Sequence, residues 1–486
     1  MQPKKMVLKN ESKVFYKKAY FAVERALEAS TFISVVGPRM VGKTTILMQL
    51  QAKFGGKYYS FKGMNADQAD DAFDLVLQSA QNNESVIFYL DEITYLDDFG
   101  RKLSFFSQVL PRLAAKGEQP RFKIVISGSQ EHSIFSNVAK ALGGRATTVH
   151  VPFLSFGEFL VYKNRLSWNS DFSLEALKDS VTEDDFYDYL LNGYTFNSTF
   201  TSPQDYLMGC IEESINSEMK ESWPNASTIS IEKDEFNNIL SVIYTILIKL
   251  HAKEKYKKYG DYVNLLQKIR SFYNNQHRDS KIKEIPFKDA ISSAHFSAYQ
   301  KQKMKKDEFF KILRFLYEMH LINFIKPSLN DMGFSDFLQG FISAWNTADD
   351  FLLSYNPYFG NAQFFMSILN EIGKHLGISA IDLLDGSLLG SMIECMIRES
   401  LTQLAGLTTN ELNNTTGAEV DCIVGGMAVE ISVRNKSISE THFDSFPELE
   451  DYKKILLTND ILDLNNDIKR IPYYVFLAYT DFSKEV

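Results

Sequence analysis

The octapeptide at residues 37–44, GPRMVGKT, constrains the fold of this chain more than any other feature. Residues 32–36 before it form an apolar run typical of a buried strand, and residues 45–50 after it continue as an apolar helix. Glycines in a G-x-x-x-x-G-K-[ST] pattern let backbone N–H groups turn toward phosphate oxygens at a helix N-terminus, whose dipole favours an anion. The expected nucleotide-binding residues are Gly37, Pro38, Arg39, Met40, Val41, Gly42, Lys43, Thr44 and Thr45.

Two side chains of this loop have expected roles in binding ATP with Mg²⁺. Lys43 is expected to reach the β- and γ-phosphates, and the Thr44 hydroxyl to ligate the metal ion. A glycine-bearing turn that binds nothing is the competing interpretation, and the flanking strand and helix argue against it.

A second acidic element follows the apolar run at residues 85–90, which predicts a central parallel strand. Asp91 at its carboxyl end is expected to hold the magnesium ion, and Glu92 to orient the attacking water. Two acids that merely end a strand are common, but this pair follows the lysine of a matching phosphate-binding loop. The pattern therefore favours ATP hydrolysis over nucleotide storage.

Residues 122–126 predict the next strand, and the polar sequence SGSQ follows it. Ser129 and Gln130 are candidate sensors of the γ-phosphate, with an ordinary turn as the alternative. Arg145, just before a predicted strand at 147–151, is a candidate arginine finger that acts in cis or on a neighbouring subunit. A surface arginine with no catalytic role is the alternative.

The bulk composition indicates a multidomain globular protein. The chain has 486 residues, 45% of them hydrophobic and 23% charged, which is too long for a single ordinary core. No apolar run is long enough to cross a bilayer, and three widely spaced cysteines form no CxxC pair. We therefore expect a cytoplasmic protein with no membrane partner.

The net charge of −9 is unevenly distributed. Residues 249–318 carry 17 Lys and Arg against 8 Asp and Glu, including the run KQKMKK at 301–306. This basic middle is a candidate face for DNA or RNA, and a solvated helical surface is an equal alternative.

The segment from SGSQ through LGGRATTVHVPFLSFGEFL, residues 127–160, resembles a bacterial and archaeal family of AAA-type P-loop ATPases. Members carry a Ser-Gly-Ser end to the fourth strand, a Gly-Arg before the fifth, and a following Leu-Ser-Phe-x-Glu-Phe segment. The resemblance implies a helical lid, a winged-helix-like middle that binds DNA, a protein partner or its own ATPase domain, and a C-terminal PD-(D/E)XK, restriction-endonuclease-like domain. The implied domains are 1–157 (ATPase), 158–230 (lid), 231–328 (winged helix) and 329–486 (nuclease-like).

The nuclease-like prediction depends on the sequence GAEVDCIVGGMAVEISVRNK at residues 417–436, which has the pattern of a hairpin around Gly-Gly. Asp421 and Glu430 are candidate Mg²⁺ ligands, with Glu394 from a predicted helix at 387–404 as a third donor. A helix at about 447–457 and a strand at 471–478 are expected to complete this domain. Ser432 stands where such nucleases carry a lysine, so phosphodiester cleavage lacks its usual cation.

Together these features predict an α/β protein: a P-loop ATPase of the AAA type, a lid, a winged-helix-like middle and an α/β C-terminal domain. Three functions stay open: an ATP-gated nuclease, an ATP-switched DNA-binding or protein-interaction module without nuclease activity, and a signalling or toxin-like switch that works through protein contacts. Other protein subunits are candidate partners, and the oligomeric state is not determined by the sequence.

Overall fold

The computed structural model describes residues 15–37, 41–128, 142, 146–170, 172–193, 322–325, 332–333, 356–359, 361–362, 364–366, 379, 384, 386–405, 407–408, 410–413, 419–432 and 440–482. The chain divides into two compact units. The first contains residues up to 154 together with 158–167, and the second contains 155–157 and the residues from 168 onward. The expected boundaries near residues 230 and 328 lie outside the described residues.

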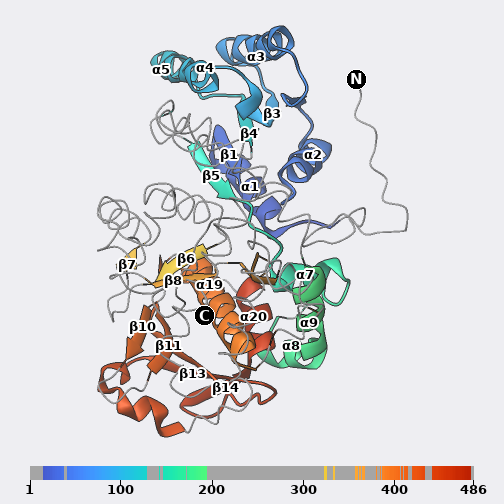
Figure 1. Ribbon diagram of the computed structural model, residues 1–486. Coiled ribbons are helices and arrows are strands. Elements are labelled where there is room, and N and C mark those ends of the chain that lie inside the picture. Colours follow the sequence, from blue (N-terminus) through green and yellow to red (C-terminus); the bar gives the residue numbers. More distant parts are fainter. Residues whose placement is uncertain are drawn as a thin grey trace, which may run out of the picture. The chain divides into compact units, whose positions relative to one another are not determined.

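The first unit is built on a parallel sheet in the order β2-β3-β4-β1-β5 (Figure 1). Its strands are β1 (Phe32–Val36), β2 (Lys57–Ser60), β3 (Ile87–Asp91), β4 (Lys123–Ser127) and β5 (Ala146–His150). The predicted strands at 32–36, 85–90, 122–126 and 147–151 are confirmed to within two residues at each end. In a parallel sheet all carboxyl ends lie at one edge, so the loop after β1 lies at the same edge as Asp91, which ends β3, and Glu92, which follows it.

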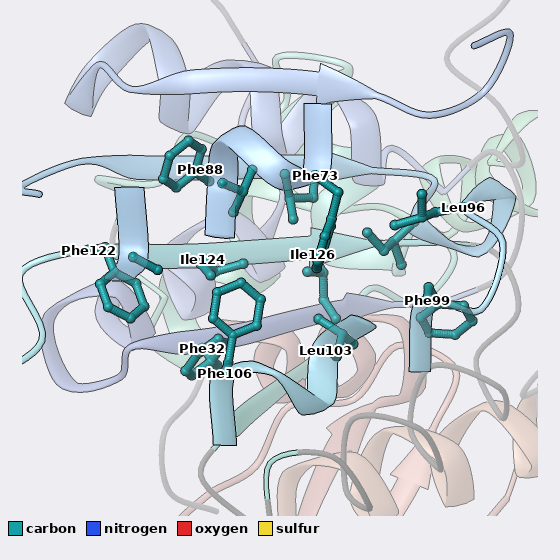
Figure 2. Close-up of a cluster of buried hydrophobic side chains, with 14 of the residues drawn as sticks. Phe32, Phe73, Phe88, Leu96, Phe99, Leu103, Phe106, Phe122, Ile124 and Ile126 are labelled. Atoms are coloured by element: carbon teal, nitrogen blue, oxygen red, sulfur yellow. The ribbon is translucent and has the colours of Figure 1, made fainter. Parts of the chain in front are cut away.

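Helices cover both faces of this sheet because side chains on a strand alternate between the two faces. Phe32 and Val36 of β1 belong to the core beneath α3 (Ala66–Gln81), α4 (Phe99–Ser104) and α5 (Phe106–Ala115). Ile33 and Val35 point to the opposite core, beneath α1 (Lys18–Ala29) and α2 (Lys43–Phe54). Figure 2 shows the first core, where Phe73 of α3 and Phe106 of α5 lie among strand residues. The result is a three-layer α/β/α arrangement.

The second unit contains α8 (Leu174–Ser180), α9 (Glu183–Asn192) and the last helix, α20 (Tyr473–Phe482). Lys178 Nζ donates to the Tyr474 hydroxyl at 2.9 Å, and the Tyr473 hydroxyl donates to Glu183 Oε1 at 2.8 Å. The Phe172 and Phe482 rings stack with centroids 3.9 Å apart. The part of the predicted lid between Phe172 and Glu183 therefore packs against α20.

The second unit also contains a mixed sheet in the order β10-β11-β12-β13-β14. These strands are β10 (Asn410–Asn413), β11 (Glu419–Val424), β12 (Met427–Ile431), β13 (Lys453–Thr458) and β14 (Ile468–Pro472). The first three are antiparallel and the last two continue in parallel with β12. Helix α19 (Gly386–Ala405) precedes them. The predicted hairpin and the predicted helix at 387–404 are confirmed.

Two predictions for this unit are wrong. Residues 447–457 do not form one helix: a short 3₁₀ turn, η4 (Pro447–Leu449), is followed by β13, which pairs with β12. Residues 471–478 do not form a strand, because β14 ends at Pro472 and α20 begins at Tyr473. In both places pairing and burial in the folded chain override the local sequence preference.

Within the segment predicted to form the winged helix, the short strand β6 (Ile322–Ile325) pairs antiparallel with β8 (Asn356–Phe359). In a second short antiparallel pair, β7 (Met332–Gly333) lies beside β9 (Leu407–Thr408). The remainder of the predicted winged-helix domain and the basic run at 301–306 lie outside the described residues. Within the described residues, no helix has both the length and the apolar character needed to cross a bilayer.

Candidate nucleotide-binding site

The loop after β1 depends on glycines at both of its ends. Gly37 has φ of +148°, and a Cβ placed there would lie 2.3 Å from the Val151 carbonyl oxygen. Gly42 has φ of +98° and lies at the N-cap of α2. A residue with a side chain would be strained at either position. The backbone of this loop therefore requires the two glycines that the sequence pattern names.

Lys43 opens α2 and is 5% exposed. Its Nζ donates to the Gly37 carbonyl oxygen at 2.8 Å. The Lys43 side chain thus crosses the loop, from the first residue of α2 back to Gly37, the residue that follows β1. An ammonium group in this position is close to where phosphate oxygens would meet the N-terminus of α2.

Asp91, the last residue of β3, receives three side-chain hydrogen bonds while only 2% exposed. The Thr44 hydroxyl donates to its Oδ2 at 2.8 Å, and the Tyr58 hydroxyl donates to the same oxygen at 2.6 Å. The Ser127 hydroxyl donates to Oδ1. Asp91 therefore joins the phosphate-binding loop to β2 and β4, and the structure brings Thr44 and Asp91 together as the sequence predicts.

Glu92 directly follows Asp91 and adopts the left-handed conformation, with φ of +53° and ψ of +49°. A non-glycine residue in this region costs free energy, and such strain is concentrated at functional sites. The Glu92 backbone N–H faces Ser127 Oγ at 3.5 Å, and η1 (Ile93–Tyr95) begins at the next residue. This conformation turns the chain sharply at the carboxyl end of β3.

Tyr58 and Ser127 are members of the site that the sequence did not identify. Burial, followed by the Asp91 carboxylate, raises the pKa of Tyr58 above its ordinary value, so its hydroxyl keeps its proton and donates. Ser127 is the first serine of the SGSQ run, two residues before the predicted sensor. Pro38, Arg39, Met40, Ser129, Gln130 and Arg145 lie outside the described residues, so their predicted roles stay predictions.

The donor set fits a magnesium ion. Mg²⁺ prefers hard oxygen ligands and usually binds proteins through one or two side-chain oxygens plus phosphates and water. Thr44 Oγ1 and Asp91 Oδ2 are such oxygens and lie 2.8 Å apart. These two residues would hold the ion, and a bound Mg²⁺ would supply positive charge beside the phosphate oxygens.

Residues 29–160 match the family model described as an AAA domain. Together with the parallel sheet and the loop after β1, this match makes the segment an AAA-type P-loop ATPase domain. No curated protein matches the chain.

Solved structures with a similar arrangement have low identity. The Walker-type ATPase PABY2304 of Pyrococcus abyssi is 15% identical, with 64% of this chain and 91% of that chain covered and a TM-score of 0.32. The replication initiator DnaA bound to AMPPCP and single-stranded DNA is 14% identical, with 70% and 96% covered and a TM-score of 0.26. A DNA replication initiation factor is 17% identical, with 62% and 92% covered and a TM-score of 0.25. The assignment of the domain therefore rests on the family match and on the sheet.

The C-terminal carboxylates occupy a different environment. Asp421 of β11 and Glu430 of β12 are 1% and 0% exposed. The Ile431 backbone N–H donates to Asp421 Oδ2 at 2.8 Å, and the Asp421 backbone N–H lies 3.3 Å from Glu430 Oε2. His442 in η3 (Glu440–Ser445), which the sequence did not single out, has its Nε2 3.7 Å from Glu430 Oε2. One oxygen of each acid thus accepts a backbone N–H across the hairpin.

Glu394 of α19 is paired within its own helix, because Arg398 Nη2 donates to Glu394 Oε1 at 2.9 Å and both side chains are buried. Among the described residues, no group of three or more His, Cys, Asp or Glu side chains is placed to hold a metal ion. Ser432 follows the end of β12 and has no charge. The magnesium site that the sequence predicted from Asp421, Glu430 and Glu394 therefore stays a prediction.

Proposed function

We propose that this chain binds and hydrolyses ATP at the loop after β1. The observation that carries the proposal is the 2.8 Å hydrogen bond from the Thr44 hydroxyl to Asp91. It places the hydroxyl of the phosphate-binding loop beside the acid that ends β3, which is the pairing that a nucleotide-bound magnesium ion requires.

Each residue has a distinct role in this proposal. The backbone N–H groups at the start of α2 bind phosphate oxygens, and Lys43 leaves Gly37 to reach the β- and γ-phosphates. Thr44 and Asp91 are the metal ligands. Glu92 orients the attacking water and polarises it, as the acid after β3 does in hydrolytic P-loop enzymes. Ser129 is proposed as the γ-phosphate sensor and Arg145 as the arginine finger.

The test of nucleotide binding is titration of a fluorescent ADP analogue. Lys43→Ala is expected to abolish saturable binding, because the buried ammonium group that neutralises the phosphates is lost. Lys62→Ala removes an exposed lysine of the same domain and is expected to bind like the wild type. Equal affinity in Lys43→Ala and the wild type would contradict the proposed site.

For the C-terminal domain we propose a restriction-endonuclease-like core that works with nucleic acid without cleaving it. A helix, an antiparallel meander of three strands and a parallel fourth strand support this assignment. The backbone hydrogen bonds of Asp421 and Glu430 favour a structural role for these acids over metal binding. An ATP-switched protein-interaction module is the second candidate function.

The basic residues at 301–306 distinguish these two candidates. Binding of the 486-residue chain to a DNA duplex should weaken as salt rises, because lysines release counterions from the phosphates. Changing Lys301, Lys303, Lys305 and Lys306 to Gln is expected to weaken binding and to flatten the salt dependence. DNA binding that this change leaves untouched, or no DNA binding by the wild type, would favour the protein-interaction module.

A further inference from the structure

Lys17, just before α1, is buried directly against the phosphate-binding loop. It is 4% exposed, and its Nζ donates to the Val41 carbonyl oxygen at 3.3 Å and to the Pro152 carbonyl oxygen at 2.5 Å. Its alkyl chain passes beside Gly42, since a Cβ built on that glycine would lie 3.8 Å from Lys17 Cδ. Lys17 therefore joins the loop after β1 to the chain after β5.

The charge of this lysine is balanced within the same unit. Glu158 is 2% exposed, and its Oε2 lies 4.0 Å from Lys17 Nζ. Its Oε1 accepts the backbone N–H of Lys18, the first residue of α1, at 2.7 Å. A carboxylate at a helix N-terminus is favourable. Burial lowers the pKa of Lys17, and the Glu158 carboxylate opposes this shift.

The backbone on the N-terminal side of Lys17 is held in place by contacts that do not involve Glu158. Gln49 Nε2 of α2 donates to the Phe15 carbonyl oxygen at 2.8 Å, and the Phe15 ring meets the Tyr162 ring edge-on with centroids 5.7 Å apart. The backbone segment before Lys17 is thus anchored to α2 and to Tyr162, which fixes where the Lys17 side chain begins.

The position of the Val41 carbonyl determines the direction of the neighbouring N–H. The Val41–Gly42 peptide bond is trans, and in a planar trans peptide the C=O and the following N–H point in opposite directions. A carbonyl oxygen bound to Lys17 on one side therefore directs the Gly42 N–H to the other side. In a loop of this pattern the phosphate is bound by such N–H groups.

We infer that Lys17 and Glu158 form a positioning pair that holds the Val41–Gly42 peptide in the orientation that binds phosphate. This inference rests on the proposed nucleotide binding. Neither residue contacts the nucleotide in this proposal; both act through the loop backbone. The sequence offers no motif for the pair, because its members lie 141 positions apart (158 − 17).

The test is the Kd for the fluorescent ADP analogue, measured beside the melting temperature. The Lys17→Met, Glu158→Gln double variant removes both charges, so no unpaired charge stays buried. It is expected to melt close to the wild type and to raise the Kd about tenfold. Lys123→Met is the matched control, because Lys123 also donates to backbone carbonyls but lies at the amino end of β4, away from the loop.

The outcomes separate the inference from the proposed function. A raised Kd in the double variant with an unchanged Kd in Lys123→Met supports the positioning pair. A wild-type Kd in a double variant that melts normally overturns it and leaves the proposed nucleotide site intact. A wild-type protein that binds no nucleotide overturns both. If the methionine variant does not fold, the Lys17→Gln, Glu158→Gln variant keeps neutral polar side chains and should show the same rise.

Discussion

At the scale of single residues, Asp91 organises the proposed ATPase site. Its two oxygens accept hydroxyl donors from three different elements, namely Thr44 from α2, Tyr58 from β2 and Ser127 from β4. A buried carboxylate is stable when such donors satisfy its oxygens. The same oxygens are thereby held at the edge where the phosphate-binding loop begins.

Tyr58→Phe tests the contribution of the tyrosine donor. Loss of its hydrogen bond to Asp91 is expected to lower the free energy of unfolding by about 1 kcal/mol near neutral pH. The pKa of Tyr58 is higher in the folded state than the value of about 10 expected in the unfolded state. The protonated hydroxyl therefore contributes its full stabilisation below about pH 10. This contribution is lost as the pH rises from about 10 through the folded-state pKa. The variant should therefore lose stability less steeply than the wild type above pH 10.

Chemical denaturation at several pH values measures both effects. Tyr95→Phe is the matched control, since Tyr95 is 49% exposed, and its unfolding curves are expected to overlay those of the wild type. Identical curves for Tyr58→Phe and the wild type at all pH values would contradict the role given to this hydroxyl.

Local motifs made some of these residues predictable and left others hidden. Lys43, Thr44, Asp91 and Glu92 follow from a contiguous loop and from the end of an apolar run, which are short-range patterns. Tyr58 lies 33 residues from Asp91 in the sequence. Tyr58 meets Asp91 because β2 pairs with β3 in the folded sheet. No residue spacing in the sequence predicts that contact.

At the scale of elements, the last helix packs tightly against the start of α7 (Phe156–Tyr162) within the second unit. The Gly157 backbone N–H donates to Asp481 Oδ2 at 2.6 Å. A Cβ on Gly157 would lie 2.7 Å from Asp481 Cβ and 2.8 Å from the Phe482 ring. This approach is possible because residue 157 has no side chain.

Gly157→Ala is therefore expected to destabilise the protein by about 1–3 kcal/mol, the usual cost of forced overpacking. Gly390→Ala is the matched control, because Gly390 lies in α19 with no atom within 4 Å of an added Cβ. Alanine there should raise helix stability by about 0.5–1 kcal/mol. Thermal unfolding measures both changes, and equal shifts for the two glycines would contradict the close packing of α20.

The two wrong element predictions have physical causes. A short apolar run such as residues 453–458 fits a strand or a buried helix equally well, and its parallel pairing with β12 decides the outcome. Residues 473–478 are all buried, so α20 has no polar face to give a helical period. Its aromatic and β-branched residues favour a strand when judged from the sequence alone. In the folded chain these residues form a helix that is buried on every face.

At the scale of the whole molecule, the two predicted sites differ in the hydrogen-bond partners of their carboxylates. Thr44 of the phosphate-binding loop donates a hydrogen bond to Asp91 at the end of β3, whereas Asp421 and Glu430 accept hydrogen bonds from backbone N–H groups. A family-like order of elements therefore does not establish catalysis, because activity depends on the site rather than on the fold.

The 486-residue chain is accordingly expected to leave supercoiled plasmid intact in Mg²⁺ or Mn²⁺, with or without ATP. Asp421→Ala should instead lower the free energy of unfolding by about 1–3 kcal/mol, because the buried Ile431 N–H loses its acceptor. Gel analysis of the plasmid and denaturant unfolding measure these effects. Metal-dependent cleavage that disappears in Asp421→Ala would contradict the non-cleaving role proposed for this domain.

The central claim is ATP hydrolysis with Glu92 as the residue that orients the water. The most direct test is phosphate release by Glu92→Gln, measured beside the binding of a fluorescent ATP analogue. Glutamine keeps the size of the side chain but removes the negative charge, so binding should stay within about twofold of the wild type while turnover falls by a factor on the order of 100 or more. Wild-type turnover in Glu92→Gln would contradict the account.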